Sequence, residues 1–271
     1  MQIPHKSDLK MLQSDVRKHN QDAWDNQVDQ SNRWTTPVDR ETIQRARNGD
    51  FAIVLTPTKP VPKDWFPSLQ GTETLCLASA GGQQAPILAA AGARVTVFDN
   101  SPKQLDQDRF VADRDGLEMK FVEGDMADLS MLFDDSFDFI FHPCSNMFSS
   151  KVIPVWQECF RVLRSGGVLM TGFTNPMRYI FDDERKENGN LEVRYALPYS
   201  DSDHVDEDHI REMIQTGKPL EFGHTLEDQI GGQLRAGLML TGFYEDRYAD
   251  SDHDPLSAFL DTFIATRAVK P

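Results

Sequence analysis

Apolar and polar positions alternate along most of the chain in two different periods. Short apolar runs typical of strands are separated by segments with the 3.6-residue period of helices. The pattern predicts seven strands, at residues 74–78, 94–99, 119–123, 137–141, 168–173, 238–244 and 262–268. It predicts helices at residues 83–91, 102–115, 155–163 and 226–236. Such alternation favours an α/β fold with a doubly wound, mostly parallel sheet.

Local signals place several of the element ends. Pro102 follows Asn100 and Ser101, which is a typical helix start. The pair Gly166-Gly167 is expected to end the helix at residues 155–163. The loop between the last two strands has no room for a helical crossover, so an antiparallel C-terminal hairpin is expected at the sheet edge.

Three regions lie outside this regular pattern. Residues 1–71 are expected to form an N-terminal helical extension, lying against the domain rather than in its core, and a Pro-rich surface connection at residues 55–67. Residues 72–271 then form the main domain. Within it, residues 175–224 are polar and acidic, and they are expected to form an insert after the fifth strand, on the substrate side.

Composition excludes some classes of function. The 271 residues carry a net charge of −15, and the electric field of such a charge repels phosphate backbones, which argues against nucleic acid as a partner. No apolar run is long enough to span a membrane, and the N-terminus lacks the apolar core of a secretion signal. The three cysteines, Cys76, Cys144 and Cys159, show no pairing pattern and predict reduced thiols. The expected location is cytoplasmic.

The segment TLCLASAGGQQ, residues 74–84, predicts a nucleoside cofactor site. An apolar run ends there in a turn of small residues, a helix follows, and the next apolar run ends in Asp99. Small residues let backbone N–H groups approach a ligand, and an acid at the tip of the second strand accepts hydrogen bonds from ribose hydroxyls. The turn fits the dehydrogenase spacing G-x-G-x-x-G poorly. A plain strand-to-helix connection is the alternative.

From about Thr72 to Pro271 the chain resembles the class I S-adenosylmethionine-dependent methyltransferases. Residues 76–82 resemble the family's D-x-G-x-G-x-G turn, with Cys76, Ala78 and Ala80 in place of the acid and two glycines. Because alanine restricts the backbone, this turn is expected to be wider, or to hold only negative φ at the alanines. Three further matches are Asp99, the G-D-x turn Gly124-Asp125-Met126, and the F-D-x-I strand at residue 137 with its R-x-L-x-x-G-G segment at residue 161.

The resemblance implies a seven-stranded sheet, S-adenosyl-L-methionine as cofactor, and a set of binding residues. The turn residues Ala78, Ser79, Ala80, Gly81 and Gly82 would line the methionine and ribose side. Asp99, Asn100 and Ser101 would hold the ribose, and Gly124, Asp125 and Met126 the adenine. Residues 31–37 resemble a segment that precedes the catalytic domain in some bacterial members and folds over the cofactor. Trp34 would then shield the methionine end as part of a candidate lid; alternatively, Trp24 and Trp34 only anchor the extension.

The acceptor is expected after the fourth strand, where the sequence reads FHPCSNM at residues 141–147. This differs from the Asn/Asp-Pro-Pro-aromatic sequence of enzymes that methylate adenine or glutamine amides, which argues against planar exocyclic amines as acceptors. His142 is the candidate general base and lies near the cofactor, and Asn146 and Ser145 are candidates for orienting the acceptor. Alternatively, these residues satisfy local backbone groups. A catalytic Cys144 is a further alternative.

The acidic loop contains a carboxylate–imidazole cluster that is expected to be solvated and to bind no metal. Its members are Asp201, His204, Asp206, Asp208 and His209. The insert is expected to form the acceptor wall, with Arg178, Tyr179, Arg194, Tyr195 and Tyr199 supplying its polar and aromatic groups. Its acidity suits a cationic acceptor.

The sequence therefore predicts a methyltransferase acting on a small-molecule acceptor by in-line transfer. Three alternatives stay open: an NAD(P)-dependent oxidoreductase with a Rossmann domain, a non-catalytic S-adenosylmethionine-binding sensor, and an aminopropyl transferase.

Overall fold

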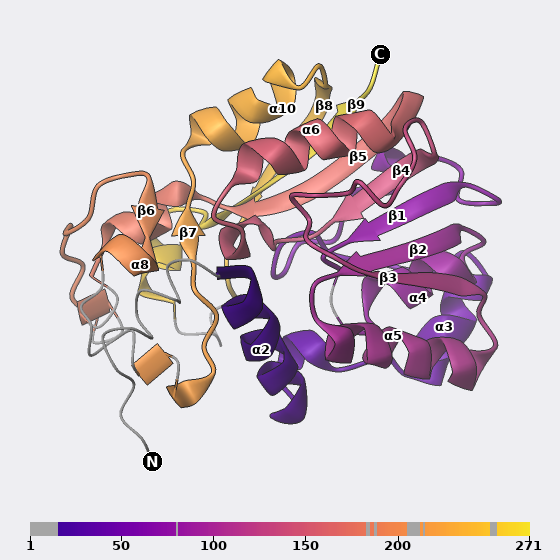
Figure 1. Ribbon diagram of the computed structural model, residues 1–271, viewed down its shortest axis with the longest axis horizontal. Helices are drawn as coiled ribbons and strands as arrows, with labels where there is room; N and C mark the ends of the chain where they lie inside the picture. Colours follow the sequence, from indigo (N-terminus) through magenta and orange to yellow (C-terminus); the bar gives the residue numbers. More distant parts are fainter. Residues whose placement is uncertain are drawn as a thin grey trace.

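The fold is built on a seven-stranded sheet with helices on both faces (Figure 1). The computed structural model describes residues 16–79, 81–182, 185–186, 189–204, 212–213, 215–249 and 254–271. The strand order is β3-β2-β1-β4-β5-β9-β8. The strands are β1 (Glu73–Leu77), β2 (Arg94–Asp99), β3 (Met119–Glu123), β4 (Phe137–His142), β5 (Leu163–Thr174), β8 (Met239–Asp246) and β9 (Phe263–Val269). Neighbours from β3 to β5 are parallel, and β9 is antiparallel to both β5 and β8. The predicted α/β class and C-terminal hairpin are confirmed.

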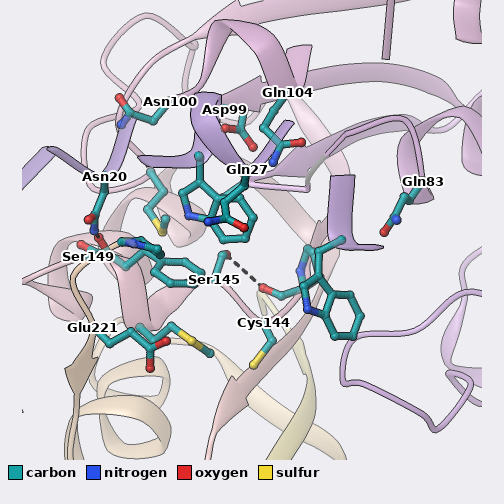
Figure 2. Close-up of a pocket in the computed structure, with 18 of the residues that line it drawn as sticks. Asn20, Gln27, Gln83, Asp99, Asn100, Gln104, Cys144, Ser145, Ser149 and Glu221 are labelled. Atoms are coloured by element: carbon teal, nitrogen blue, oxygen red, sulfur yellow. Dashed lines mark hydrogen bonds between the residues drawn. The ribbon is translucent and has the colours of Figure 1, made fainter. Parts of the chain in front are cut away.

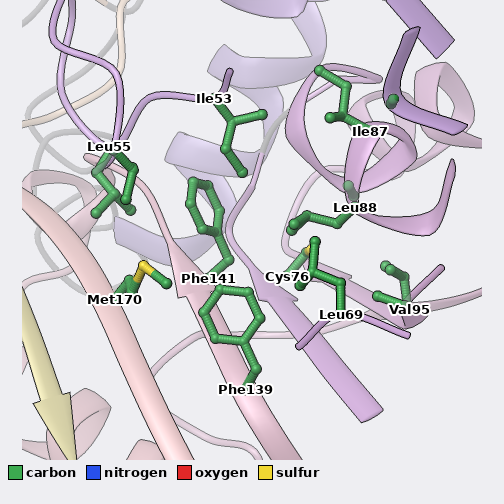
Figure 3. Close-up of a cluster of buried hydrophobic side chains, with 14 of the residues drawn as sticks. Ile53, Leu55, Leu69, Cys76, Ile87, Leu88, Val95, Phe139, Phe141 and Met170 are labelled. Carbon is green, nitrogen blue, oxygen red and sulfur yellow. The ribbon is translucent and has the colours of Figure 1, made fainter. Parts of the chain in front are cut away.

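Two hydrophobic layers hold helices against the sheet. On one face lie α3 (Arg40–Arg47), α4 (Gln84–Ala90) and α5 (Pro102–Asp115), and on the other α6 (Val152–Val162) and α10 (Gly232–Arg235). Figure 3 shows Phe139 and Phe141 of β4 at the centre of the first layer. Each fully buried side chain of this size contributes about 1.5–3 kcal/mol. The central strand β4 is therefore buried on both faces.

The remaining elements are short, apart from α2 (Val16–Asp29). They are η1 (Arg33–Thr35), η2 (Lys63–Trp65), η3 (Asn146–Phe148), η4 (Pro176–Ile180), β6 (Tyr199–Ser200), α8 (Asp201–His204), β7 (Phe222–Gly223), the π-turn η5 (Glu227–Gly231) and η7 (Pro255–Ala258). The insert contributes β6 and β7, which pair as a second, two-stranded sheet. No helix in the described part of the chain is both long and apolar enough to cross a membrane.

The prediction that Gly166-Gly167 ends a helix is wrong. Helix α6 stops at Val162, and β5 starts at Leu163 and runs through both glycines. Leu163 pairs with Phe137 and Val168 with Phe139, so the longer stretch of β5 bulges against β4. Gly166 adopts φ +80° in this bulge, a backbone conformation that glycine reaches without a Cβ clash.

The polar sequence predicted that the extension lies against the domain and not in its core. The structure buries part of the extension in the core. Ile43 and Ala46 of α3 are buried in the first hydrophobic layer, together with Leu55 and Trp65 of the Pro-rich connection. A single apolar pair three residues apart is enough to bury one face of an eight-residue helix, and the surrounding charges hide it. The connection therefore packs as part of the core.

The extension also contacts the turn after β1 closely enough to forbid a side chain there. A Cβ on Gly81 would lie 2.9 Å from Cα of Thr35 and 2.4 Å from Oε1 of Gln104. Gly116, with the same φ of +63°, has nothing within 4 Å of its would-be Cβ. Substitution of the two glycines therefore distinguishes the cost of backbone strain from the cost of steric crowding.

We predict that Gly81→Ala destabilises the protein more than Gly116→Ala. Both variants have the strain of a positive φ, about 1–2 kcal/mol, but only Gly81→Ala adds a clash of about 1–3 kcal/mol against backbone. Urea unfolding of the two variants measures the difference. Equal losses of unfolding free energy would show that the extension does not pack on this turn in solution.

Candidate functional site

A cavity of about 360 Å³ opens where the carboxyl ends of β1, β2 and β4 meet α2. The strand order reverses between β1 and β4, and open α/β sheets bind ligands at such a point. The volume is in the range of small-molecule sites. Figure 2 shows Asp99, Asn100 and Gln104 towards one end of the cavity and Glu221 and Cys144 towards the other. We call these, after the ligands expected from the sequence, the nucleoside end and the acceptor end.

Asp99 stands at the tip of β2 and lines the nucleoside end with Asn100. The N–H of Ser101 donates to Asp99 Oδ1 over 2.9 Å, and Ser101 Oγ accepts from the N–H of Gln104 as the cap of α5. Ser101 is itself buried and is not among the lining residues. The cap fixes the Asp99 carboxylate at the edge of the cavity.

The turn Gly124-Asp125-Met126 also lines this end. The N–H of Gly124 donates to the carbonyl of Asp99 over 2.9 Å, which joins the ends of β2 and β3. A Cβ on Gly124 would lie 2.2 Å from Cζ of Phe98, so glycine is required for the ring to pack there. Phe98, which lines the cavity, was not among the predicted site residues.

The turn after β1 departs from the expected backbone. Ala78 adopts φ +44°, so of the two expected alternatives, a wider turn or only negative φ at the alanines, the second is wrong. Its N–H donates to the carbonyl of Phe98 over 2.8 Å, a bond that offsets the strain of the left-handed conformation. Ala78 lines the cavity, whereas Ser79, Gly81 and Gly82 lie behind the lining. Ala80 lies outside the described residues.

Two glutamines at the cavity have buried polar atoms without a partner. Gln104 is 2% exposed, and neither its amide oxygen nor its amide nitrogen has a hydrogen-bond partner among the described residues. Oε1 of Gln84 is in the same state. A buried polar atom left unpaired costs about 1–3 kcal/mol, so both side chains suit a polar ligand. No motif marks them; only their place at the starts of α4 and α5 could have pointed to them.

The structure does not bring His142 and Asn146 to the cavity lining. Both are fully buried. The two ring nitrogens of His142 lie 2.8 Å from the Leu77 carbonyl and 2.7 Å from Oδ1 of Asn146. Asn146 Nδ2 donates onward to Gln229 over 3.2 Å. Burial lowers the pKa of His142, while its two hydrogen bonds act in the opposite direction.

Cys144 and Ser145 do line the acceptor end. Burial raises the pKa of the Cys144 thiol to about 12, so it stays protonated at neutral pH and is a poor nucleophile. Ser145 Oγ donates to the Pro143 carbonyl over 3.0 Å.

Helix α2 covers the cavity and is attached at both rims. Asp25 accepts hydrogen bonds from Ser101 Oγ at 2.6 Å and from the Lys103 N–H at 3.2 Å. On the opposite rim, Asn20 donates to the Leu220 carbonyl and accepts from the Leu220 N–H. Trp24 of α2 and Trp34 of η1 both line the cavity.

The insert reaches the cavity through Pro219 and Glu221. None of the five arginines and tyrosines predicted for the wall is a lining residue. Asp201 accepts from the Tyr199 hydroxyl, and His204 stacks on the Tyr199 ring. Within the described ranges no group of three or more histidines, cysteines or carboxylates could hold a metal. Asp206, Asp208 and His209 lie outside those ranges.

The strand order and the cavity at its switch point define the class I methyltransferase fold. The sequence at residues 75–171 matches the methyltransferase domain family. The chain belongs to the S-adenosylmethionine-dependent methyltransferases, and its cofactor is S-adenosyl-L-methionine.

Among individual relatives, the uncharacterized methyltransferase YbaJ of Bacillus subtilis is 49% identical over 93% of this chain and 97% of its own length. An S-adenosylmethionine-dependent methyltransferase from Mesorhizobium loti has a similar fold, with a TM-score of 0.58 at 18% identity over 76% of this chain and 94% of that one. One from Methanosarcina mazei gives 0.53 at 18% identity over 79% and 98%.

We predict that buried His142 makes stability depend on acid pH. Its pKa in the folded state lies below the unfolded value of about 6.5, so the unfolded chain takes up a proton first as the pH falls. Between the unfolded-state and folded-state pKa values, the free energy of unfolding therefore decreases by about 1.4 kcal/mol for each unit by which the pH falls. Urea unfolding of wild type and His142→Gln from neutral to acid pH should show a flatter profile for the variant. Parallel profiles would mean that His142 is protonated equally in both states.

Proposed function

We propose that this methyltransferase methylates a small molecule held at the acceptor end of the cavity, and that an acceptor with a positive charge is favoured. The observation that carries the proposal is one continuous cavity, with Asp99 towards one end and Glu221 towards the other. Its volume suits small molecules, and the net charge of −15 favours cations over anions.

The lining residues fit the cofactor. Asp99 and Asn100 would accept and donate hydrogen bonds at the ribose, Asp125 would face the adenine amino group, and Phe98 with Met126 would cover the ring. The unpaired amides of Gln84 and Gln104 would bind the polar methionine portion. When bound, the cofactor supplies a methyl group on a positively charged sulfur that leaves as a neutral thioether.

Alignment and exclusion of water are the protein's main tasks in such an in-line transfer. Helix α2 would act as the lid, with Trp24 and Trp34 excluding water from the reacting atoms. His142 and Asn146 would act as positioning residues, because both lie behind the lining and are occupied by hydrogen bonds. They would hold the end of β4, from which Cys144 and Ser145 face the acceptor.

We predict that Asp99→Asn weakens binding of S-adenosylmethionine and S-adenosylhomocysteine by about 10- to 100-fold, because charge-assisted hydrogen bonds are worth about 1.5–3 kcal/mol. Isothermal titration measures it. The matched control is Asp106→Asn, an exposed aspartate of α5 paired with Arg109, which should leave affinity unchanged.

A turnover assay, with the same variant as its control, tests the acceptor class. Wild-type protein should form S-adenosylhomocysteine in the presence of the low-molecular-weight fraction of a cell extract, and Asp99→Asn should form far less. Turnover that requires the protein or nucleic acid fraction instead would contradict a small-molecule acceptor. Tight binding of NADH would contradict the assignment of the nucleoside end.

We predict that Asp25→Ala releases one rim of α2. Loss of its bonds to Ser101 and Lys103 should speed dissociation of S-adenosylhomocysteine about tenfold, the effect of about 1.4 kcal/mol. The control is Asp22→Ala on the same helix, which pairs with Lys18. Stopped-flow dissociation compares the two. Unchanged dissociation from Asp25→Ala would mean that α2 is a strut and not a lid.

A further inference from the structure

We infer that Glu221 is the residue that selects the acceptor, by binding an alkylammonium group at the acceptor end of the cavity. This inference rests on the proposed function and adds to it a specific residue and a chemical class of ligand. Among the described residues that line the cavity, four carry a formal charge at neutral pH: Arg17, Asp99, Asp125 and Glu221. Asp99 and Asp125 belong to the nucleoside end, and Arg17 donates to Asn100 there. Within the described part of the lining, Glu221 is therefore the charged group that is left for the acceptor.

The Glu221 carboxylate is held in place by its neighbours. The Tyr179 hydroxyl donates to Oε2 over 2.8 Å, and the Glu221 N–H donates to Oδ2 of Asp201 over 2.7 Å. Burial raises the pKa of Tyr179 well above its usual value, so the hydroxyl keeps its proton. Oε1 of Glu221 has no hydrogen-bond partner among the described residues, which leaves an acceptor atom for a ligand N–H or a bare ammonium.

Two arginines stand near this end without cancelling the charge of Glu221. Arg178 lies 3.7 Å from Asp254 and 5.3 Å from the centre of the Tyr248 ring. Its charge is opposed by both Glu221 and Asp254, so these two carboxylates and Arg178 together remain negatively charged. Arg33 lies 4.4 Å over the Trp34 ring and 6.0 Å from that of Tyr248. Neither arginine is a lining residue.

An aromatic pair is fixed to the same part of the wall. Trp24 and Phe148 line the cavity and meet edge to face, with centroids 5.0 Å apart. Asn20, one turn before Trp24, donates to the Phe148 carbonyl over 2.9 Å and binds the backbone of Leu220 beside Glu221. A carboxylate and aromatic rings on one wall can together recognise an alkylammonium, because the carboxylate pairs with its charge and the ring faces attract the cation.

Three probes of nearly equal shape test this inference. They are choline, its uncharged isostere 3,3-dimethylbutan-1-ol, and the anion 3,3-dimethylbutanoate, each titrated into the complex with S-adenosylhomocysteine. Choline should bind about tenfold tighter than the neutral isostere, a difference of about 1.4 kcal/mol, because only choline forms a charge pair with Glu221 and cation–π contacts with the aromatic rings. Glu221→Gln should abolish this preference. Equal affinities, binding of none at millimolar concentration, or preference for the anion would overturn the inference, and the last would point to Arg178.

Controls separate this inference from the proposed function. Glu227→Gln, whose side chain is 82% exposed on the surface, should keep the preference for choline. Glu221→Gln should bind S-adenosylhomocysteine as wild type does, since Glu221 lies at the other end of the cavity. Failure of the wild type to bind S-adenosylhomocysteine would count against the proposed function, and the probe series on the free protein would then decide the role of Glu221.

Discussion

The hydrogen bond between the His142 ring and the Leu77 carbonyl joins β1 to β4 where the strand order of the sheet reverses. Backbone pairing between the two strands ends at Cys76 and Phe141, one residue short of this bond. Beyond it the chains separate, which creates the crevice that ligands use in open α/β sheets. Losing this buried hydrogen bond would cost more than its modest net contribution to stability, because each group would then be unpaired and buried away from water. The His142 ring does not line the cavity, but its hydrogen bond fixes the point at which the crevice begins.

From that point the nucleoside end is assembled by contacts that leave little freedom. Ala78, the residue after Leu77, accepts a positive φ and bonds to the carbonyl of Phe98. The Phe98 ring in turn packs against Gly124, where no Cβ could be accommodated. These contacts therefore connect the ends of β1, β2 and β3 to one another. The alanine at residue 78, where the family has a glycine, is tolerated because its N–H has a fixed partner. The strain sits at the ligand-facing residue, where the surrounding structure over-determines it.

Local chemistry made much of the fold predictable. The bounds of β2, β3 and α5 agree with the sequence pattern, since apolar alternation and the Ser101-Pro102 start are signals within a few residues. The α6–β5 boundary was not predictable in the same way, because the glycine pair forms a bulge whose cause is the partner strand. For the site, motifs located Asp99 and the Gly124 turn. Gln104 and Glu221 carry no motif, and the bonds of Asn20 to Leu220 join residues 200 positions apart. Such long-range placement leaves no local pattern to read.

The cavity is lined by residues from two different parts of the chain. Asp99, Asp125 and Gln104 lie within residues 75–171, the part that matches the methyltransferase domain. Trp24, Glu221 and Tyr248 lie outside it, on the N-terminal helix, the insert and the segment after β8. A shared fold at 18% identity is therefore no reason to share an acceptor. Asn20 joins helix α2 to the insert, so the residue proposed to select the acceptor and the helix proposed as the lid are held as one unit. Under these two proposals, acceptor choice and lid closure would be coupled through the same few hydrogen bonds, because displacing the helix also removes one wall of the acceptor end.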